Sequence, residues 1–252
     1  MKSCVINPIG TSPMIVTELF RYLRNVDPGL RDVIIIHTKN KEVLKGAKIA
    51  KASLLANYSD VRVQLRETKT DDIGNEQELE MFLELVIDTM ATERDQFNVD
   101  KFYLNVTGGR KIQTISLSIF AGVLGISEVY NVIDRNVSSF NEFWEREKFD
   151  LDNFETINDN DQLVSEYEKK REILDGLFYP DPNVLNFLKV PVVVMPQDER
   201  NILKKLINGV SIDDEDFTKA KLSSYQSSGL ITYDSRRTYP TELGRIILKY
   251  LR

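Results

Sequence analysis

The sequence holds little of the two residues that most often build metal and redox sites. Among its 252 residues there is one cysteine, Cys4, and one histidine, His37. A single cysteine cannot form a disulfide within the chain, which favours an intracellular compartment, and we expect a cytoplasmic protein. A single histidine excludes every metal site built on a pair of histidines. We expect a protein without a metal or another cofactor.

Cys4 and His37 themselves are expected to be structural. Cys4 lies in an apparent first strand with Val5 and Ile6, where a cysteine behaves as a small buried apolar residue. His37 closes the apolar run 33–36, and it could be either a polar residue at a strand end or a catalytic base. We favour the strand end, because a lone histidine is not specific for catalysis.

Positive charge and long apolar runs are also scarce. The formal net charge is -6, and a protein that coats nucleic acid would be basic, so any contact with nucleic acid must be local. No stretch approaches the ~20 apolar residues that cross a bilayer. The N-terminus lacks the basic start and apolar run of a signal peptide. We expect no membrane partner.

The first 135 residues alternate between two apolar patterns. Short apolar runs predict strands, and longer segments with apolar residues at helical spacing predict helices between them. Strands that alternate with helices form right-handed βαβ units and a mostly parallel sheet. We therefore predict an α/β fold with a Rossmann-like domain over 1–135. The predicted strands cover 4–6, 32–38, 61–65, 102–106 and 129–133. One predicted helix starts at Pro13, and three others cover 42–55, 76–92 and 111–124.

One of these strands is expected near the edge of the sheet. Apolar and polar residues alternate over 61–65, which is typical of a strand with one face in solvent. The other runs are more continuously apolar, as in strands that helices cover on both faces.

The remainder of the chain divides into two parts. Residues 136–190 are polar and rich in turns apart from an amphipathic helix predicted over 162–178, and we interpret them as an inserted or connecting helical segment. Residues 191–252 predict a small winged helix-turn-helix domain. Its expected helices cover 197–208, 213–219, 220–228 and 241–251, and its expected wing is a hairpin over 230–239.

The segment after the fourth strand carries the strongest local signal. It reads Thr107-Gly108-Gly109-Arg110-Lys111 and lies between a predicted strand and a predicted helix. Glycines let the backbone approach a ligand, and a helix N-terminus attracts anions. Arg110 and Lys111 add positive charge where a phosphate would bind, although a tight turn with both basic side chains in solvent fits the same residues.

A second loop of the same kind follows the first strand. It reads Gly10-Thr11-Ser12-Pro13 and precedes a predicted helix, for which Ser12 could be the N-cap, worth about 1 kcal/mol, or a donor to a phosphate. In open α/β sheets ligands bind beyond the carboxyl ends of the strands, where the strand order reverses. We expect the two loops to converge on one crevice that binds a phosphate-bearing ligand.

These two loops resemble the motifs of a known family. Asn105-Val106-Thr107-Gly108-Gly109-Arg110-Lys111 is similar to the signature loop of CRISPR-associated Rossmann-fold (CARF) domains. Gly10-Thr11-Ser12-Pro13, followed by Val16-Thr17-Glu18, is similar to the first-strand motif of the same family. The resemblance covers about residues 1–135. A winged helix at the C-terminus is also common among CARF proteins.

The resemblance implies a ligand and an oligomeric state. CARF domains are homodimers that bind cyclic oligoadenylates, usually cyclic tetra-adenylate, across a two-fold axis. Many CARF proteins carry a HEPN ribonuclease whose signature needs a histidine, and no histidine follows residue 135 here. An effector nuclease is therefore disfavoured. The positions that match ligand-binding residues are Gly10, Thr11, Ser12, Asn105, Thr107, Gly108, Gly109, Arg110 and Lys111.

The function that we favour at this stage is that of a ring nuclease. In such CARF enzymes a ribose 2′-OH attacks its own 3′-phosphate without a metal, which leaves a 2′,3′-cyclic phosphate and switches off type III CRISPR signalling. The enzyme must enforce in-line geometry and stabilise charge on the phosphoryl oxygens. Ser12, Arg110 and Lys111 are the catalytic candidates. Lys169-Lys170-Arg171 could form a lid, although a solvated helix face is the usual fate of such a charge run.

The alternative is a transcription regulator that binds DNA in response to the cyclic ligand without cleaving it. The wing residues Arg236-Arg237, together with Lys219, Lys221 and Arg245, could contact phosphates. The acidic run 213–216 precedes the expected recognition helix and would repel DNA. We therefore treat DNA as a partner that is considered but not favoured.

Overall fold

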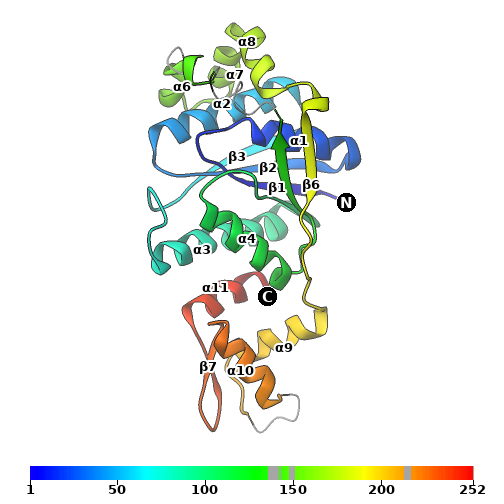
Figure 1. Ribbon diagram of the computed structural model, residues 1–252, viewed down its shortest axis with the longest axis vertical. Coiled ribbons are helices and arrows are strands. Elements are labelled where there is room, and N and C mark those ends of the chain that lie inside the picture. The colour runs from blue at the N-terminus through cyan, green and yellow to red at the C-terminus, as the bar shows by residue number, and fades with distance from the viewer. Residues whose placement is uncertain (136–141, 143, 148–150, 213–216, 252) are drawn as a thin grey trace.

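The computed structural model describes residues 1–135, 142, 144–147, 151–212 and 217–251 (Figure 1). A twisted sheet lies between two layers of helices, and a smaller region of helices and a hairpin follows at the C-terminal end. No helix in the described ranges is both long and apolar enough to cross a membrane.

The sheet has six strands in the order β3-β2-β1-β4-β5-β6. All neighbouring strands pair in parallel except β5 and β6, which are antiparallel. This order confirms the predicted α/β class with a mostly parallel, Rossmann-like sheet. The strands are β1 (Ser3–Pro8), β2 (Leu30–His37), β3 (Arg62–Glu67), β4 (Lys101–Asn105), β5 (Val129–Asp134) and β6 (Leu185–Lys189).

The burial of the strands explains their sequence patterns. β1 is buried along its whole length and β2 at all but one residue, because helices cover both faces of the central strands. β3 pairs only with β2, and in it Val63 is buried whereas Arg62 and Gln64 are partly exposed. The predicted position of this strand at the edge is confirmed.

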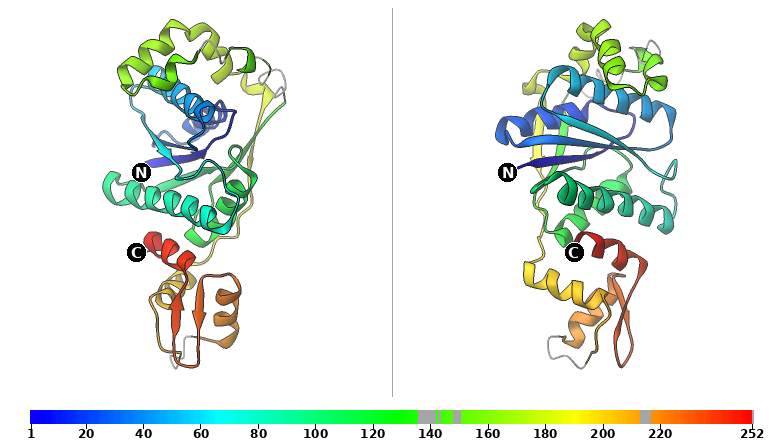
Figure 2. Two further views of the ribbon diagram at one scale, coloured as in Figure 1. Left: turned by 90° about the vertical axis from the view of Figure 1, so that its left-hand side faces the viewer. Right: turned by 180° about the vertical axis from the view of Figure 1, so that it is seen from behind.

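Alternate residues of the central strands serve two apolar cores. Val5 and Ile35 belong to the core beneath α1 and α2, whereas Ile6 and Ile36 belong to the core beneath α3 and α4. Figure 2 shows the two helix layers, one on each side of the sheet, in two further views. The helices are α1 (Ile15–Val26), α2 (Lys41–Asn57), α3 (Glu76–Phe97) and α4 (Lys111–Leu124).

The segment expected to connect the domains packs over α2 and completes the sheet. The helix predicted over 162–178 is interrupted at Lys170, which has non-helical torsion angles (φ -122°, ψ 16°). Its buried side chains, such as Tyr167 and Phe178, join the core of α1 and α2. The elements are α6 (Asn153–Thr156), α7 (Asn160–Lys169), α8 (Arg171–Phe178) and a 3₁₀ turn (Pro182–Val184) that leads into β6.

β6 was not predicted from the sequence, and the strand over 129–133 is therefore not the last one of the sheet. Leu185 pairs with Asp134 and Lys189 with Tyr130, so the strand is defined by residues far away in the chain. Its own five residues are partly or fully exposed and carry no distinctive pattern.

The C-terminal region has the helices and the hairpin expected of the winged helix-turn-helix. The helix predicted over 213–219 lies mostly outside the described residues. The last helix, α11, packs on α3: Lys249 Nζ lies 2.7 Å from Glu84 Oε1, and Arg94 donates to the carbonyl of Tyr250. The elements are α9 (Gln197–Ile207), α10 (Lys219–Ser227), β7 (Ile231–Tyr233), β8 (Thr238–Pro240) and α11 (Glu242–Leu251).

A buried ionic cluster joins the edge strand to α3. Arg62 donates to both Asp32 and Glu93, and neither carboxylate side chain is exposed. Burial raises the pKa of Glu93 even though the Arg62 guanidinium opposes this shift. Arg62 therefore compensates the buried Glu93 and shares the compensation of Asp32 with Lys2, whose Nζ lies 2.9 Å from Asp32 Oδ2.

We predict that Arg62→Ala lowers the free energy of unfolding by about 3 kcal/mol, because it removes the cation paired with the buried Glu93 and leaves the buried Asp32 with Lys2 alone. Urea denaturation at pH 7 measures the loss. The loss should shrink as the pH falls, since a carboxyl with a raised pKa in the folded state takes up a proton there first and then needs no cation. Arg31→Ala, which removes an exposed partner of Asp60, is the control and should cost less than about 1 kcal/mol.

Candidate functional site

The loops after β1 and β4 meet at the carboxyl edge of the sheet. β1 and β4 are adjacent, and the chain leaves β1 toward α1 on one face and β4 toward α4 on the other. This is the point at which the strand order reverses, where α/β sheets bind ligands. A Cβ atom on Gly10 would lie only 3.7 Å from the backbone nitrogen of Gly109. The structure therefore brings the two predicted loops together.

Two buried amides hold these loops in place. Asn105 Nδ2 donates to Asn7 Oδ1 (2.9 Å) and to the carbonyl of Ile15 (3.1 Å), while its Oδ1 accepts from the N–H of Thr107 (3.0 Å). Asn7 Nδ2 in turn donates to the carbonyl of Ile34 (3.3 Å). The Asn105 side chain thus connects β1, β4 and α1 beneath the two loops. It faces the protein interior rather than a ligand.

Three further residues of the second loop also have structural roles. Thr107 Oγ1 accepts from the N–H of Val132 (2.7 Å), which ties the loop to β5. A side chain at Gly108 would place its Cβ 2.1 Å from Ile15 Cδ1. Gly109 has φ +80°, a left-handed conformation that favours glycine. These contacts explain why the loop has this sequence without requiring each residue to touch the ligand.

The N-terminus of α4 is a region of positive charge next to the second loop. Arg110 is the N-cap, and Gln113 Oε1 accepts from its N–H (2.7 Å). No acidic residue lies in the first turn, and Lys111 is exposed at the first helical position. The partial positive charge of the helix end and two cationic residues therefore lie together at the start of α4.

A pocket of ≈ 230 Å³ opens beside this helix end. Of the nine residues predicted to bind the ligand, Gly10, Thr11, Gly109 and Arg110 line it. Ser12 and Lys111 adjoin lining residues in the chain, whereas the other three lie in the supporting structure described above. The full lining is Ile9, Gly10, Thr11, Thr38, Asn40, Val43, Asp71, Gly109, Arg110 and Gln113.

Several lining residues were missed in the sequence. Thr38 and Asn40 follow β2, whose carboxyl end lies at the same edge as that of β1, and this position could have identified them. Asn40 Oδ1 accepts from the N–H groups of Glu42 (2.9 Å) and Val43 (3.3 Å), so it caps α2. Asp71 comes from the β3–α3 connection, where no local pattern indicated a place in the pocket.

The start of α1 differs from the prediction. The helix begins at Ile15 and Met14 is its N-cap, without a side-chain hydrogen bond. The prediction that Ser12 could be an N-cap is therefore wrong, because Ser12 lies two residues before the capping position.

The basic cluster Lys169-Lys170-Arg171 lies away from the pocket. Arg171 Nη1 donates to Asn57 Oδ1 (3.0 Å) at the C-terminal end of α2, and Lys169 pairs with Glu166. The pocket lies at the opposite end of α2, whose 17 residues span about 25 Å. In this arrangement the cluster is part of a helix face that is paired with neighbouring carboxylates and does not cover the pocket.

The lone cysteine and histidine are buried outside the pocket lining. Burial raises the pKa of the Cys4 thiol well above its ordinary value, which makes a thiolate nucleophile unfavourable. His37 ends β2, and its Nδ1 lies 2.9 Å from the carbonyl oxygen of Thr38. Among the residues that the structure describes, no three His, Cys, Asp or Glu side chains gather as a metal site would require.

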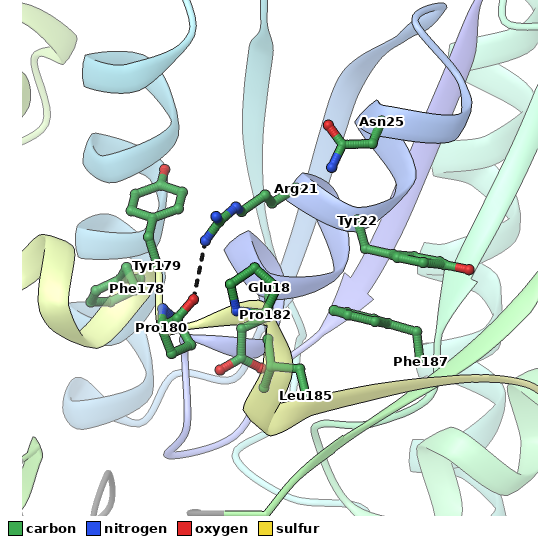
Figure 3. A pocket seen from close by; sticks show the side chains of 10 residues that line it. All are labelled: Glu18, Arg21, Tyr22, Asn25, Phe178, Tyr179, Pro180, Pro182, Leu185 and Phe187. Atoms are coloured by element: carbon green, nitrogen blue, oxygen red, sulfur yellow. Dashed lines mark hydrogen bonds between the residues drawn. The ribbon is translucent and has the colours of Figure 1, made fainter.

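A second, smaller pocket lies between α1 and the segment that leads into β6 (Figure 3). Tyr22 stacks on Phe187 in its wall, with ring centroids 4.2 Å apart. Glu18 lies at this pocket with only 6% of its surface exposed. Burial raises the pKa of Glu18 to about 7, and Asp134 adds to the shift. Glu18, which belongs to the first motif, therefore points into this pocket beside α1. It is not part of the pocket between the loops.

Comparison with known proteins identifies the family of this chain. The sequence profile of a family described as "CRISPR-associated protein NE0113" matches residues 12–222. The chain belongs to this family. The match includes the second loop, the pocket residues after β2 and β3, and the first part of the C-terminal region, and it confirms the relationship to CRISPR-associated proteins expected from the loops.

Two individual proteins show more distant similarity to this NE0113-family chain. The CRISPR system ring nuclease SSO2081 of Saccharolobus solfataricus is 26% identical over 136 residues, which cover 52% of the chain and 72% of that relative. The structure of Enterococcus italicus Csm6 bound to cyclic hexa-2′-fluoro-hexa-dAMP superimposes with a TM-score of 0.47 and 14% identity. That match covers 90% of the chain, which spans about half of Csm6 (49%).

We predict that Asn105→Ala lowers the free energy of unfolding by about 1–3 kcal/mol, because it removes the hydrogen-bond partner of the buried Asn7 Oδ1 and of the N–H of Thr107. Thermal or urea unfolding without ligand measures it. Asn25→Ala, at an exposed position of α1, is the matched control and should stay within about 0.5 kcal/mol. An unchanged stability of the Asn105 variant would contradict the positioning role.

Proposed function

We propose that this protein binds cyclic tetra-adenylate as a homodimer and cleaves it as a metal-independent ring nuclease. The observation that carries the proposal is the convergence of the two loops on one pocket beside the positive end of α4. The similarity to a ring nuclease, over about half of the chain, supports the same conclusion.

The charge of the pocket suits a phosphodiester. Arg110 lines it and Lys111 adjoins it, and the N-terminus of α4 adds its partial charge. A guanidinium can hold a phosphate through two parallel hydrogen bonds, and an ammonium acts as a point charge. The pocket therefore favours a ligand with phosphate groups over a neutral one.

The size of the pocket suits one part of a larger ligand. Its ≈ 230 Å³ is below the roughly 300–1,000 Å³ of a site that encloses a whole small molecule. One nucleotide unit of a cyclic ligand could enter, while the ring continues toward a second copy of the chain. A ligand with two-fold symmetry fits an isologous dimer, in which both copies present the same surface.

An exposed apolar face on α4 supports the dimer. Ile112, Ile115 and Ile119 lie on one side of the helix and are 38%, 55% and 63% exposed. Ile115 and Ile119, with Leu188 of β6, also line a shallow groove of ≈ 510 Å³. A contiguous apolar surface of this kind marks an interaction site. It starts two residues after Arg110, so a second copy docked there would bring two loops close to a common axis.

The proposed reaction needs only groups that the ligand and the loops supply. The 2′-oxygen of one ribose forms a bond to the adjacent phosphorus while the bond to the 5′-oxygen breaks. The 2′-OH loses its proton to solvent and the 5′-oxygen gains one, which leaves a 2′,3′-cyclic phosphate. Arg110 and Lys111 would stabilise the charge on the phosphoryl oxygens, and Ser12 would orient the phosphate or the attacking hydroxyl.

DNA binding is less well supported by the C-terminal region. Lys221 Nζ lies 2.8 Å from Glu199 Oε1, and the Tyr225 hydroxyl donates to Glu199 Oε2 (3.1 Å). Arg245 pairs with Glu242. These carboxylates lower the net positive charge of the surface that would face the DNA backbone, and we do not propose a transcription regulator.

The decisive experiment incubates the pure protein with labelled cyclic tetra-adenylate in EDTA. We expect linear products that end in a 2′,3′-cyclic phosphate. Lys111→Ala should weaken binding about 10- to 100-fold, since hydrogen bonds to charged groups contribute about 1.5–3 kcal/mol. Lys219→Ala, an exposed lysine of α10, is the control and should bind normally. Binding without cleavage would reject the enzyme, and unchanged affinity of Lys111→Ala would reject the loop as the site.

A further inference from the structure

The pocket beside the positive end of α4 also has acidic residues at its rim. The connection between β3 and α3 brings Asp71 into the lining of the pocket and places Asp72 beside it. Arg110 Nη2 lies 2.8 Å from Asp72 Oδ2. The cation expected to meet a phosphate is therefore paired with a carboxylate from another element.

The connection is fixed at both of its ends. At the start, the N–H of Thr68 donates to the carbonyl of His37 (2.8 Å), which joins it to the end of β2. At the other end, Asn75 Oδ1 accepts from the N–H of Glu78 (2.9 Å), and Glu78 Oε2 accepts from the N–H of Gly74 (2.7 Å). The residues between these anchors are thereby held at the rim of the pocket.

The carboxylate of Asp72 is oriented toward Arg110. Its Oδ1 accepts from the N–H of Ile73 (2.8 Å), and its Oδ2 pairs with the guanidinium. Both side chains are more than half exposed, at 53% for Asp72 and 63% for Arg110. Exposed ion pairs are weak, because solvent screens the charges and two side chains lose freedom. A phosphate that makes two charge-assisted hydrogen bonds can therefore displace the carboxylate.

We propose that Asp72 is an electrostatic latch on the ligand site, which holds Arg110 in the unliganded protein and releases it to an incoming phosphate. This inference rests on the proposed function of the pocket. Every ligand that binds Arg110 must first break the ion pair with Asp72, so its binding is weaker by the free energy of that pair. The negative charges of Asp71 and Asp72 also repel anions that make only partial contacts with the site. A ligand with several phosphates recovers this energy through Lys111 and the partner subunit, whereas a mononucleotide does not.

A competing explanation assigns Asp72 a positioning role, in which it holds Arg110 in the orientation that the ligand needs. The two explanations predict opposite effects of the same substitution. Without the carboxylate, a latched arginine becomes available and binding tightens, whereas a positioned arginine becomes disordered and binding weakens.

The test is a double-mutant cycle on the full-length protein, with cyclic tetra-adenylate and inorganic pyrophosphate as separate probes in isothermal titrations at low salt. We expect Asp72→Asn to lower the Kd about 2- to 5-fold. This factor corresponds to the free energy that an exposed ion pair contributes. In the Arg110→Ala background the same substitution should have almost no effect, because the two residues act as a pair. Asp71→Asn is the matched control, and any effect it has should persist without Arg110.

Each other outcome has one meaning. Weaker binding by Asp72→Asn, or equal tightening with and without Arg110, would overturn the latch. If cyclic tetra-adenylate fails to bind the native protein, the proposed function falls, and the pyrophosphate titrations then decide the latch separately. A cycle with pyrophosphate that shows coupling keeps it, whereas no coupling, or no pyrophosphate binding even by Asp72→Asn, rejects it.

Discussion

The hydrogen bond between the buried amides of Asn7 and Asn105 is the contact on which the site depends. It joins β1 to β4 at the point where the chain turns toward opposite faces of the sheet. The carbonyl of Ile15 and the N–H of Thr107 complete the network, so the start of α1 and the second loop are positioned by the same side chain. Buried polar groups that are fully paired fix one arrangement, because any other would leave them unsatisfied.

This support beneath the loops divides the residues of the family motif into two classes. Asn105, Thr107 and Gly108 keep the backbone in place through hydrogen bonds and close packing. Gly10, Thr11, Gly109 and Arg110 reach the pocket. A motif that looks like a row of ligand contacts is thus partly a framework. The proposed catalysis by electrostatic stabilisation would depend on such a framework, since the donors must already be in position when charge develops on a phosphate.

The balance of charge around α4 sets how the site can work. The helix end, Arg110 and Lys111 favour an anion, while Asp71 and Asp72 oppose it at the rim. On the next turns of the same helix, Ile115 and Ile119 form an apolar face. One helix therefore combines the proposed ligand site at its start with the apolar surface proposed for a second copy along its side, and in the proposed dimer this geometry would connect ligand binding to dimerisation.

The sequence by itself determined the layered α/β fold and the two loops. Continuous apolar runs such as β1 and β2 can be satisfied only between two helix layers, and glycine at a left-handed position such as Gly109 is a local requirement. The tertiary structure alone decided that Leu185–Lys189 joins the sheet, that Asn105 faces inward, and that Asp72 meets Arg110. Strand pairing and ion pairs between distant residues depend on which surfaces come together after the chain has folded. A local pattern of residues does not contain that information.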